Sequence, residues 1–155
     1  MHERDLPRPT VTVATIVERD GRFLLVEEET RDGTRLNQPA GHLEAGETMP
    51  AAAIRETLEE TGWHVMPTSL VGVYRWQAPG NDATFVRFAF AADARRHDAA
   101  LKLDDGIVRA LWLTYEDLVA QRVRHRSPLV LRCVDDYRAG RRWPVGFVTE
   151  INVNA

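Results

Sequence analysis

Residues 41–63 have the sequence GHLEAGETMPAAAIRETLEETGW, and this stretch decides the fold of the chain. Thr48 can cap a helix, Pro50 suits its first turn, and Gly62 follows its last turn. The stretch therefore predicts a loop that leads into a helix from Thr48 to Thr61.

Three glutamates of this helix share one face, because Glu56, Glu59 and Glu60 are spaced i, i+3 and i+4. Like charges at this spacing cost about 0.2–0.5 kcal/mol per pair in an isolated helix. A bound divalent cation reverses that repulsion, and hard carboxylate oxygens are ligands that suit Mg²⁺. The same pattern alone also fits a solvated acidic face, so the neighbouring residues have to decide.

Those neighbours favour a ligand site. Gly41 and Gly46 allow a tight loop whose backbone carbonyls can approach a ligand. Arg55 and Glu47 form an opposite-charge pair able to tie that loop to the helix. On the other side of the helix, the face that we expect to pack on a sheet comprises Ala51, Ile54, Leu58 and Thr61.

The remaining patterns predict one α/β (α+β) domain, spanning residues 1–155, with a mixed sheet. Strand patterns run from Val11 to Val17 and from Phe23 to Val26, and the Asp20-Gly21 turn signal between them predicts a hairpin. The other expected elements are a strand from His64 to Tyr74 paired with Thr84 to Ala91, a last strand from Ile107 to Leu113, and helices from Thr114 to about Val123 and from Ser127 to near Gly140.

Composition excludes several classes of protein. The chain has 155 residues, of which 44% are hydrophobic, enough for one core. Its net charge of -3 gives no basic field, so we expect no nucleic-acid partner. The N-terminus lacks an apolar signal segment and no run reaches transmembrane length, so we expect a cytoplasmic protein without a membrane partner. The single cysteine, Cys133, excludes an intramolecular disulfide, and we expect a buried thiol.

Residues 41–63 resemble the Nudix box, G-x5-E-x7-R-E-U-x-E-E-x-G-U, in which U is a bulky aliphatic residue. All seven fixed positions match, namely Gly41, Glu47, Arg55, Glu56, Glu59, Glu60 and Gly62. Two U positions depart from the pattern, because Thr57 replaces an aliphatic residue and Trp63 is aromatic. We expect Thr57 to lie on the flank of the helix, where it changes only the packing.

The resemblance implies a Nudix hydrolase with an α/β/α sandwich: a mixed central sheet, the box helix on one side and a C-terminal helix on the other. It also implies an enzyme that cuts a phosphoanhydride with Mg²⁺, for which Mn²⁺ can substitute. The metal ligands it implies are Gly41, Glu56, Glu59 and Glu60. Glu59 would orient or deprotonate the attacking water, with Glu60 as the alternative, while Arg55 and Glu47 would fix the geometry of loop and helix.

A wider resemblance connects the chain to the NudJ-like phosphatases. It rests on residues 37–44, 76–79, 87–88 and 126–130. It implies hydroxymethylpyrimidine pyrophosphate, thiamine pyrophosphate and nucleoside di- and triphosphates as substrates. Two alternatives remain: a housecleaning pyrophosphohydrolase of oxidised nucleotides, and a non-catalytic binding module. Released product, phosphate or pyrophosphate, separates the first, and the complete set of box carboxylates favours an enzyme over the second.

Four residues outside the box are candidates for substrate binding: Tyr74, Trp76, Arg87 and Asp105. Trp76 ends a strand beside a loop, where it can stack on a substrate ring or pack in the core. Arg87 can contact a phosphate or face solvent. Asp105 belongs to a turn, or supplies an extra carboxylate for a water or a second Mg²⁺. We expect a small-molecule substrate and a monomer or homodimer.

Overall fold

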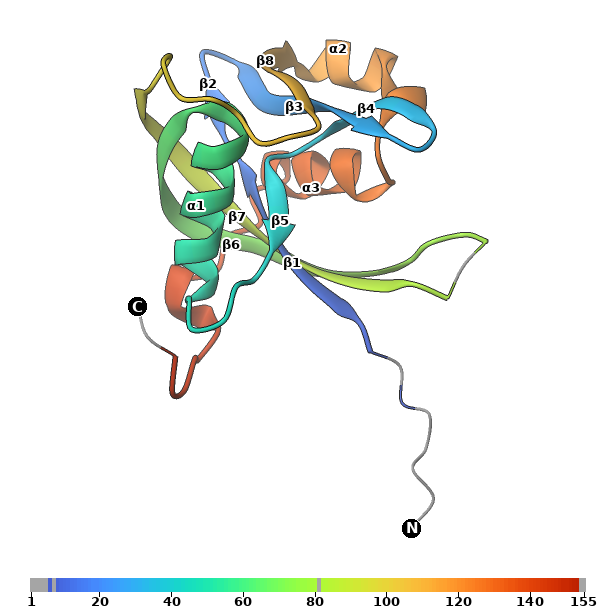
Figure 1. Ribbon diagram of the computed structural model, residues 1–155. Helices are drawn as coiled ribbons and strands as arrows, with labels where there is room; N and C mark the ends of the chain where they lie inside the picture. Colours follow the sequence, from blue (N-terminus) through green and yellow to red (C-terminus); the bar gives the residue numbers. More distant parts are fainter. Residues whose placement is uncertain (1–5, 7, 81, 154–155) are drawn as a thin grey trace.

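The computed structural model describes residues 6, 8–80 and 82–153 (Figure 1). Its strands are β1 (Thr10–Ile16), β2 (Glu18–Arg19), β3 (Arg22–Thr30), β4 (Gly33–Asn37), β5 (Ala40–His42), β6 (Trp63–Gln77), β7 (Thr84–His97) and β8 (Ile107–Thr114). Its helices are α1 (Met49–Thr61), α2 (Tyr115–Ala120) and α3 (Leu129–Arg138), with short 3-10 turns η1 (Arg122–Arg124) and η2 (Val145–Phe147).

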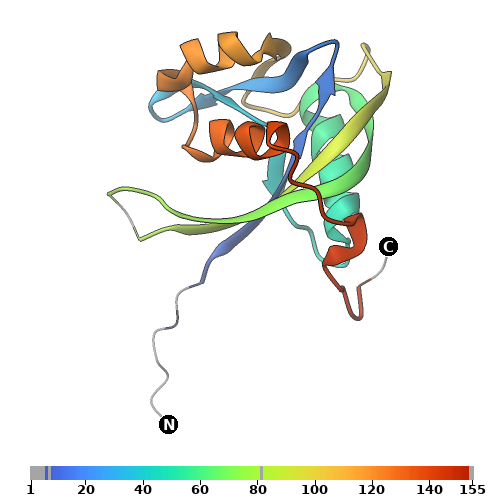
Figure 2. The same cartoon turned by 180° about the vertical axis from the view of Figure 1, so that it is seen from behind.

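The strands form two four-stranded sheets. The first has the order β5-β1-β7-β6, in which β1 lies parallel to β7 and antiparallel to β5. The second is antiparallel and contains β2, β3 and β4, with β8 paired to the other edge of β3. The expected hairpin of β6 and β7 is confirmed, and it extends away from the body of the molecule (Figures 1 and 2).

The expected hairpin between the first two strands is wrong. The Asp20-Gly21 turn joins only the two-residue β2 to β3, with Arg19 opposite Arg22. β1 instead enters the other sheet between β5 and β7, where its last four residues, Val13 to Ile16, are buried on both faces of the sheet. The chain therefore changes sheets at Val17, next to the turn.

Helices cover both faces of the mixed sheet, as the α/β/α expectation requires (Figures 1 and 2). On one face, Val13 and Phe90 pack with Ala52 and Ala53 of α1. On the other face, the cluster that includes α3 contains Ile16, Val71, Ala89, Ala91, Val130, Cys133 and Val134. That second cluster also contains Phe23, Leu25 and Leu113, so the antiparallel sheet shares the core on this side.

The caps of α1 agree with the sequence, whereas its packing face does not. The Thr48 hydroxyl accepts from the Ala51 N–H at 3.2 Å, and Gly62 ends the helix with φ 76°. The buried residues are Ala52, Ala53, Thr57, Glu60 and Thr61, so of the face expected to pack only Thr61 is buried. The small side chains of Ala52 and Ala53 pack on the sheet instead, and Glu60 is the one glutamate of the acidic face that is buried with them.

A C-terminal segment also holds α1. The Leu70 N–H donates to the Trp143 carbonyl and the Trp143 N–H to the Leu70 carbonyl, both at 2.8 Å, so the chain after α3 follows the edge of β6. Both oxygens of the Glu150 carboxylate then accept from the Met49 N–H, at 3.0 and 3.2 Å. An acidic side chain at a helix N-terminus is stabilising, because it satisfies a free N–H and complements the helix dipole.

The C-terminal helices are shorter than expected. Thr114 caps α2 as predicted, accepting from the Asp117 N–H at 3.1 Å. The helix stops at Ala120, and a 3-10 turn takes up the residues to Arg124. Among the described residues, no helix has the length and apolar character that a bilayer crossing needs.

Thr57 joins α1 to β1 through a buried pair of hydroxyls. The Thr57 hydroxyl donates to the Ala53 carbonyl at 2.7 Å, so the Thr15 hydroxyl, 2.8 Å away, is the donor to Thr57. Both side chains are fully buried. The departure from the box pattern at this position therefore fixes the helix against a partner strand, which is more than an adjustment of packing.

We predict that Thr57→Val lowers the free energy of unfolding by about 1–3 kcal/mol, because it leaves the Thr15 hydroxyl buried without its partner. The double variant Thr15→Val/Thr57→Val should recover most of this loss, since both polar groups are then removed. Urea unfolding of the wild type, both single variants and the double variant measures the coupling. Strictly additive losses would show that the two hydroxyls do not stabilise each other.

Candidate active site

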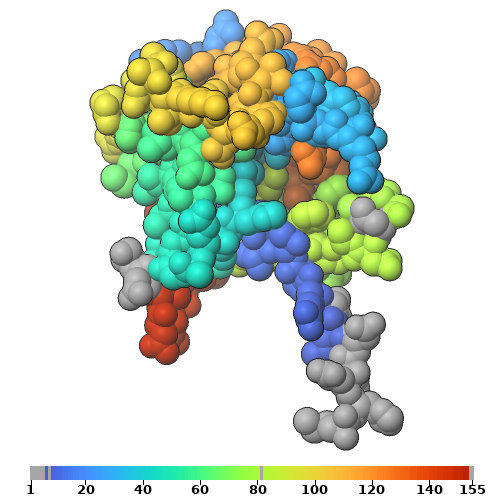
Figure 3. All heavy atoms as spheres, in the orientation of Figure 1, coloured from blue at the N-terminus to red at the C-terminus, as the bar shows by residue number. Residues whose placement is uncertain are grey.

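The inward face of α1 brings carboxylates together with the loop before β8. Oxygens of Glu56, Glu59 and Asp104 all lie within 4.8 Å of one another. The loop is held in place because the Asp104 N–H donates to the Glu59 carbonyl at 3.0 Å. In the space-filling view this loop, in yellow and gold, lies over the end of α1 (Figure 3).

β5 lies directly against these carboxylates. A Cβ at Gly41 would overlap the Glu56 carboxylate, so only glycine allows this close approach. The Ala40 N–H donates to Glu60 Oε1 at 2.8 Å, which fixes the neighbouring glutamate. The backbone at residues 40–41 is therefore within reach of the same space as the side chains of α1.

Arg55 holds the loop, the helix and the carboxylates together. Its guanidinium donates to both oxygens of Glu47, at 2.6 and 2.9 Å, and to the His42 carbonyl at 3.0 Å. It also donates to Glu56 at 2.9 Å and to Glu59 at 3.2 Å. The pairing with Glu47 keeps the pKa of that carboxyl below 4.5. The ion pair expected between Arg55 and Glu47 is thus present, and one cation orients three acidic side chains.

Two of the glutamates have raised pKa values. Burial raises the pKa of Glu60 to about 8; the Ala40 N–H opposes this, and the carboxylates of Glu28, Glu56 and Asp104 add to it. Burial also raises the pKa of Glu56, against the opposing effect of Arg55. Carboxylates held together in this way gain most from a cation that replaces their protons.

The donor set fits a divalent cation with hard-ligand preference. It consists of carboxylate oxygens and a backbone segment, which are the groups that Mg²⁺ and Mn²⁺ accept. Among the described residues, the group contains no sulfur or imidazole ligand. Glu56, Glu59 and Asp104 are the residues that could hold such an ion, and the Gly41 backbone lies against Glu56.

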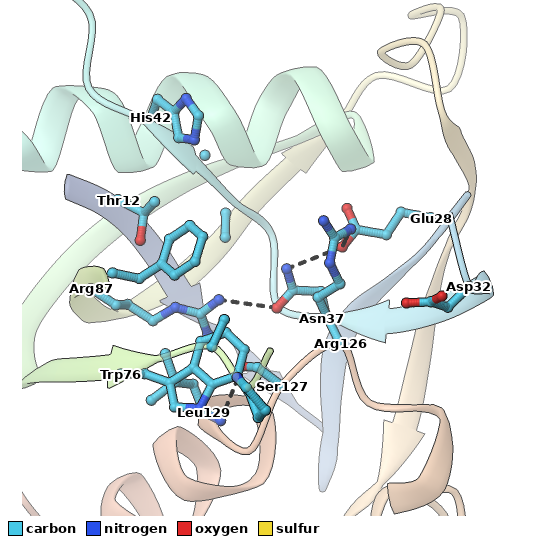
Figure 4. Close-up of a pocket in the computed structure, with 15 residues that line it drawn as sticks. Thr12, Glu28, Asp32, Asn37, His42, Trp76, Arg87, Arg126, Ser127 and Leu129 are labelled. Atoms are coloured by element: carbon cyan, nitrogen blue, oxygen red, sulfur yellow. Dashed lines mark hydrogen bonds and ion pairs between the residues drawn. The ribbon is translucent and has the colours of Figure 1, made fainter. Parts of the chain in front are cut away.

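A cavity of about 510 Å³ opens beside this group and is lined in part by Ala40, Gly41 and His42 (Figure 4). Trp76 and Phe85 line it from the β6–β7 hairpin, with ring centroids 5.8 Å apart and planes at 27°. Phe85 and Trp76 stack on each other, so together they form an aromatic wall of the cavity.

The remaining lining of the cavity is mostly polar. Glu28 Oε1 accepts from Asn37 at 3.2 Å and from Arg126 at 3.1 Å. Arg87 donates to Asn37 at 3.1 Å and, outside the lining, to Gln38 at 2.9 Å. Figure 4 shows this row of side chains crossing the cavity from Glu28 to Arg87.

The structure does not bring all four candidate substrate residues to the cavity. Trp76 and Arg87 line it, and Arg87 is buried, so solvent exposure no longer explains that residue. Tyr74 is not part of the lining; it packs against the core, and its hydroxyl donates to Asp136 at 2.8 Å. Asp105 is exposed, and its neighbour Asp104 is the one that joins the carboxylate group.

Sequence reasoning missed the polar lining. Glu28 lies in the run Glu27-Glu28-Glu29, which resembles a solvated charged segment. Alternation along β3 separates its members, since Glu27 pairs with Arg109 and Arg124 while Glu28 faces the cavity. In the sequence, Asn37 and Arg126 are indicated only by their place in the wider family resemblance.

Comparison with known proteins agrees with this arrangement. The model of the NUDIX domain matches residues 6–133, and these residues contain the complete box. The chain belongs to the Nudix family. As a Nudix hydrolase it is an enzyme that acts on phosphoanhydride bonds, and members of this family generally use divalent metals.

Individual Nudix proteins are similar to this Nudix hydrolase over most of its length. It is 38% identical over 145 residues to the phosphatase NudJ of Escherichia coli K12, which covers 94% of each chain, and equally similar to the NudJ of Shigella flexneri. A solved Nudix hydrolase from Nitrosomonas europaea is 44% identical with a TM-score of 0.91, covering 94% of this chain and 99% of that one. A MutT Nudix hydrolase from Burkholderia pseudomallei, at 20% identity and TM-score 0.71, covers 84% of this chain and 98% of that one, and shares the fold.

The raised pKa of Glu60 gives a prediction for the metal-free enzyme. The folded protein holds a proton on Glu60 up to about pH 8, whereas the unfolded chain releases it near 4.5. Protonation of Glu60 therefore contributes to the stability of the folded protein, and this contribution is complete below about pH 4.5 and is lost as the pH rises towards 8. Glu60→Gln, which resembles the protonated acid, should flatten this part of the profile.

Urea unfolding in the presence of a chelator, from pH 4.5 to pH 8, measures both proteins. Parallel profiles for the wild type and Glu60→Gln would mean that Glu60 does not hold the proton.

Proposed function

We propose that this Nudix hydrolase is an Mg²⁺-dependent phosphatase of small organic diphosphates and triphosphates, with Mn²⁺ able to substitute. One observation carries the proposal: a group of carboxylate oxygens adjoins Gly41, at one end of a cavity whose other wall is aromatic. Such an arrangement has room for a charged diphosphate at one end and a flat organic group at the other.

The metal would be held by Glu56, Glu59, Glu60 and the Gly41 carbonyl, with Asp104 as a further ligand. When bound, the cation neutralises anhydride oxygens and lowers the pKa of a water. Arg55 and Glu47 hold the loop and the helix in register, so the ligands are oriented before substrate arrives.

Glu59 is our candidate for the residue that orients or deprotonates the attacking water. Its side chain is 40% exposed, so it can reach a water in the open part of the site. Glu60 is the alternative, but it is only 8% exposed and one of its oxygens already accepts from the Ala40 N–H. A base needs access to the proton that it removes, which favours Glu59.

For the substrate we propose the kinds implied by the NudJ-like resemblance: hydroxymethylpyrimidine pyrophosphate, thiamine pyrophosphate and nucleoside di- and triphosphates. All carry a flat ring, and the aromatic wall formed by Trp76 and Phe85 supports stacking of such a ring in the cavity. Stacking tolerates many rings, which supports a broad range of substrates.

A panel of diphosphates and triphosphates, with phosphate and pyrophosphate measured separately, tests the function. Activity should disappear with a chelator and return with Mg²⁺ or Mn²⁺. Full activity without metal would overturn the mechanism, and release of pyrophosphate from triphosphates would identify a pyrophosphohydrolase instead.

Glu60→Gln tests the role of the buried glutamate. It should lower turnover by about two decades or more, which corresponds to at least about 3 kcal/mol in the barrier. Glu116→Gln on α2 serves as a control.

Trp76→Ala tests the stacking surface. The Michaelis constant for ring-bearing substrates should rise roughly 5- to 150-fold, because about 1–3 kcal/mol of stacking is lost. Trp143→Ala is the matched control, since Trp143 lies outside this cavity. Substrates without a ring should respond little to Trp76→Ala; equal losses for both kinds would make Trp76 a packing residue.

A further inference from the structure

Arg87 is a buried cation without an acidic partner. It is 6% exposed, and its side-chain hydrogen bonds go to the neutral oxygens of Asn37 and Gln38. Within the part of the chain that the structure describes, no carboxylate oxygen lies within 4.0 Å of its guanidinium, and its buried Nε has no hydrogen-bond partner. A buried charge without a counter-charge is unfavourable, so we expect a partner from outside the chain.

Two other buried charged side chains have partners of opposite charge. Glu27 pairs with Arg109 and Arg124, and Asp136 pairs with Arg132 and accepts from a tyrosine hydroxyl. Of the buried charged side chains described, only Glu60 and Arg87 lack an opposite charge within ion-pair distance. Glu60 lies with the metal-site carboxylates, so its missing partner is a cation. By the same argument, we expect the partner of Arg87 to be an acceptor on a molecule that enters the cavity.

The position of Arg87 indicates which part of that molecule it meets. On β7, Arg87 shares its face of the sheet with Phe85 and lies opposite Tyr74, two residues before Trp76. This face is covered by α3, whereas α1 and its carboxylates lie on the other face. The cavity reaches the edge strand at Ala40 and Gly41, and a Cβ at Gly41 would meet the Glu56 carboxylate. Arg87 is therefore beside the aromatic wall and away from the metal-site carboxylates.

We propose that Arg87 determines specificity by donating a hydrogen bond to an oxygen or unprotonated nitrogen acceptor on the ring that stacks on Trp76. The assignment rests on the proposed function for the position of the ring. The Arg87 Nε is buried and the Cys133 thiol lies beside the guanidinium, so Nε is not offered to a ligand. Gln38 and Asn37 hold Nη1 and Nη2 in place, so the second N–H group of each is oriented before the ligand arrives. A site built around such a donor discriminates strongly against a ring that lacks the acceptor.

Three diphosphates distinguish a contact of Arg87 with the ring from a contact with the phosphates. Uridine diphosphate carries ring carbonyls, its difluorotoluene analogue has the same shape without strong acceptors, and methyl diphosphate has no ring. The wild type should prefer uridine diphosphate to the analogue, and Arg87→Met should remove this preference by raising KM for uridine diphosphate about 10- to 150-fold, with a smaller effect on kcat. Arg95→Met, an exposed arginine of the same strand, is the control and should retain the preference.

Binding measured by calorimetry with the same ligands, without catalysis, keeps this test apart from that of the proposed function. If the wild type binds uridine diphosphate over its analogue but hydrolyses neither, the hydrolytic proposal fails and the Arg87 assignment stands. Equal weakening for methyl diphosphate would show that Arg87 binds a phosphate, and an unchanged preference in Arg87→Met would also overturn the proposal. Arg87→Lys, which keeps the charge, is the second variant; failure of both to fold would make Arg87 structural.

Discussion

Repulsion between carboxylates on the inward face of α1 is the constraint on which the site depends. Glu56, Glu59 and Asp104 hold their oxygens within 4.8 Å of one another, and Glu60 is buried behind them. The fold offsets this repulsion with one arginine, Arg55, with backbone N–H groups and with a proton. β5 and the loop that joins it to α1 are therefore arranged around charge that a cation would neutralise.

The local parts of this arrangement were predictable from sequence. The helix from Thr48 to Thr61 and its caps follow from residues adjacent in the chain, and the fixed spacing of the box gives the family. The partners of β1 were not predictable in the same way, because β5 and β7 are distant in sequence and a turn signal shows only a tight turn. Arg87 lies 49 and 50 residues from its amide partners, so no local pattern shows its burial.

The cavity is bounded by unbalanced charge of both signs. Near Gly41 the described side chains carry an excess of negative charge, and beside Trp76 they include the unpaired guanidinium of Arg87. A substrate that brings a cation to its phosphates and an acceptor on its ring complements both ends. Orientation in the cavity would then be set by electrostatics, while stacking supplies affinity with little selectivity.

The Glu150 carboxylate on the Met49 N–H makes the box helix dependent on a segment beyond the matched domain. The family model ends at residue 133, inside α3, and the contact to α1 comes 17 residues later. A protein shortened to the domain boundary would therefore lose a helix cap next to its own active site. The box helix therefore has a cap that its family signature does not cover, and a change at Glu150 acts on the N-terminus of α1.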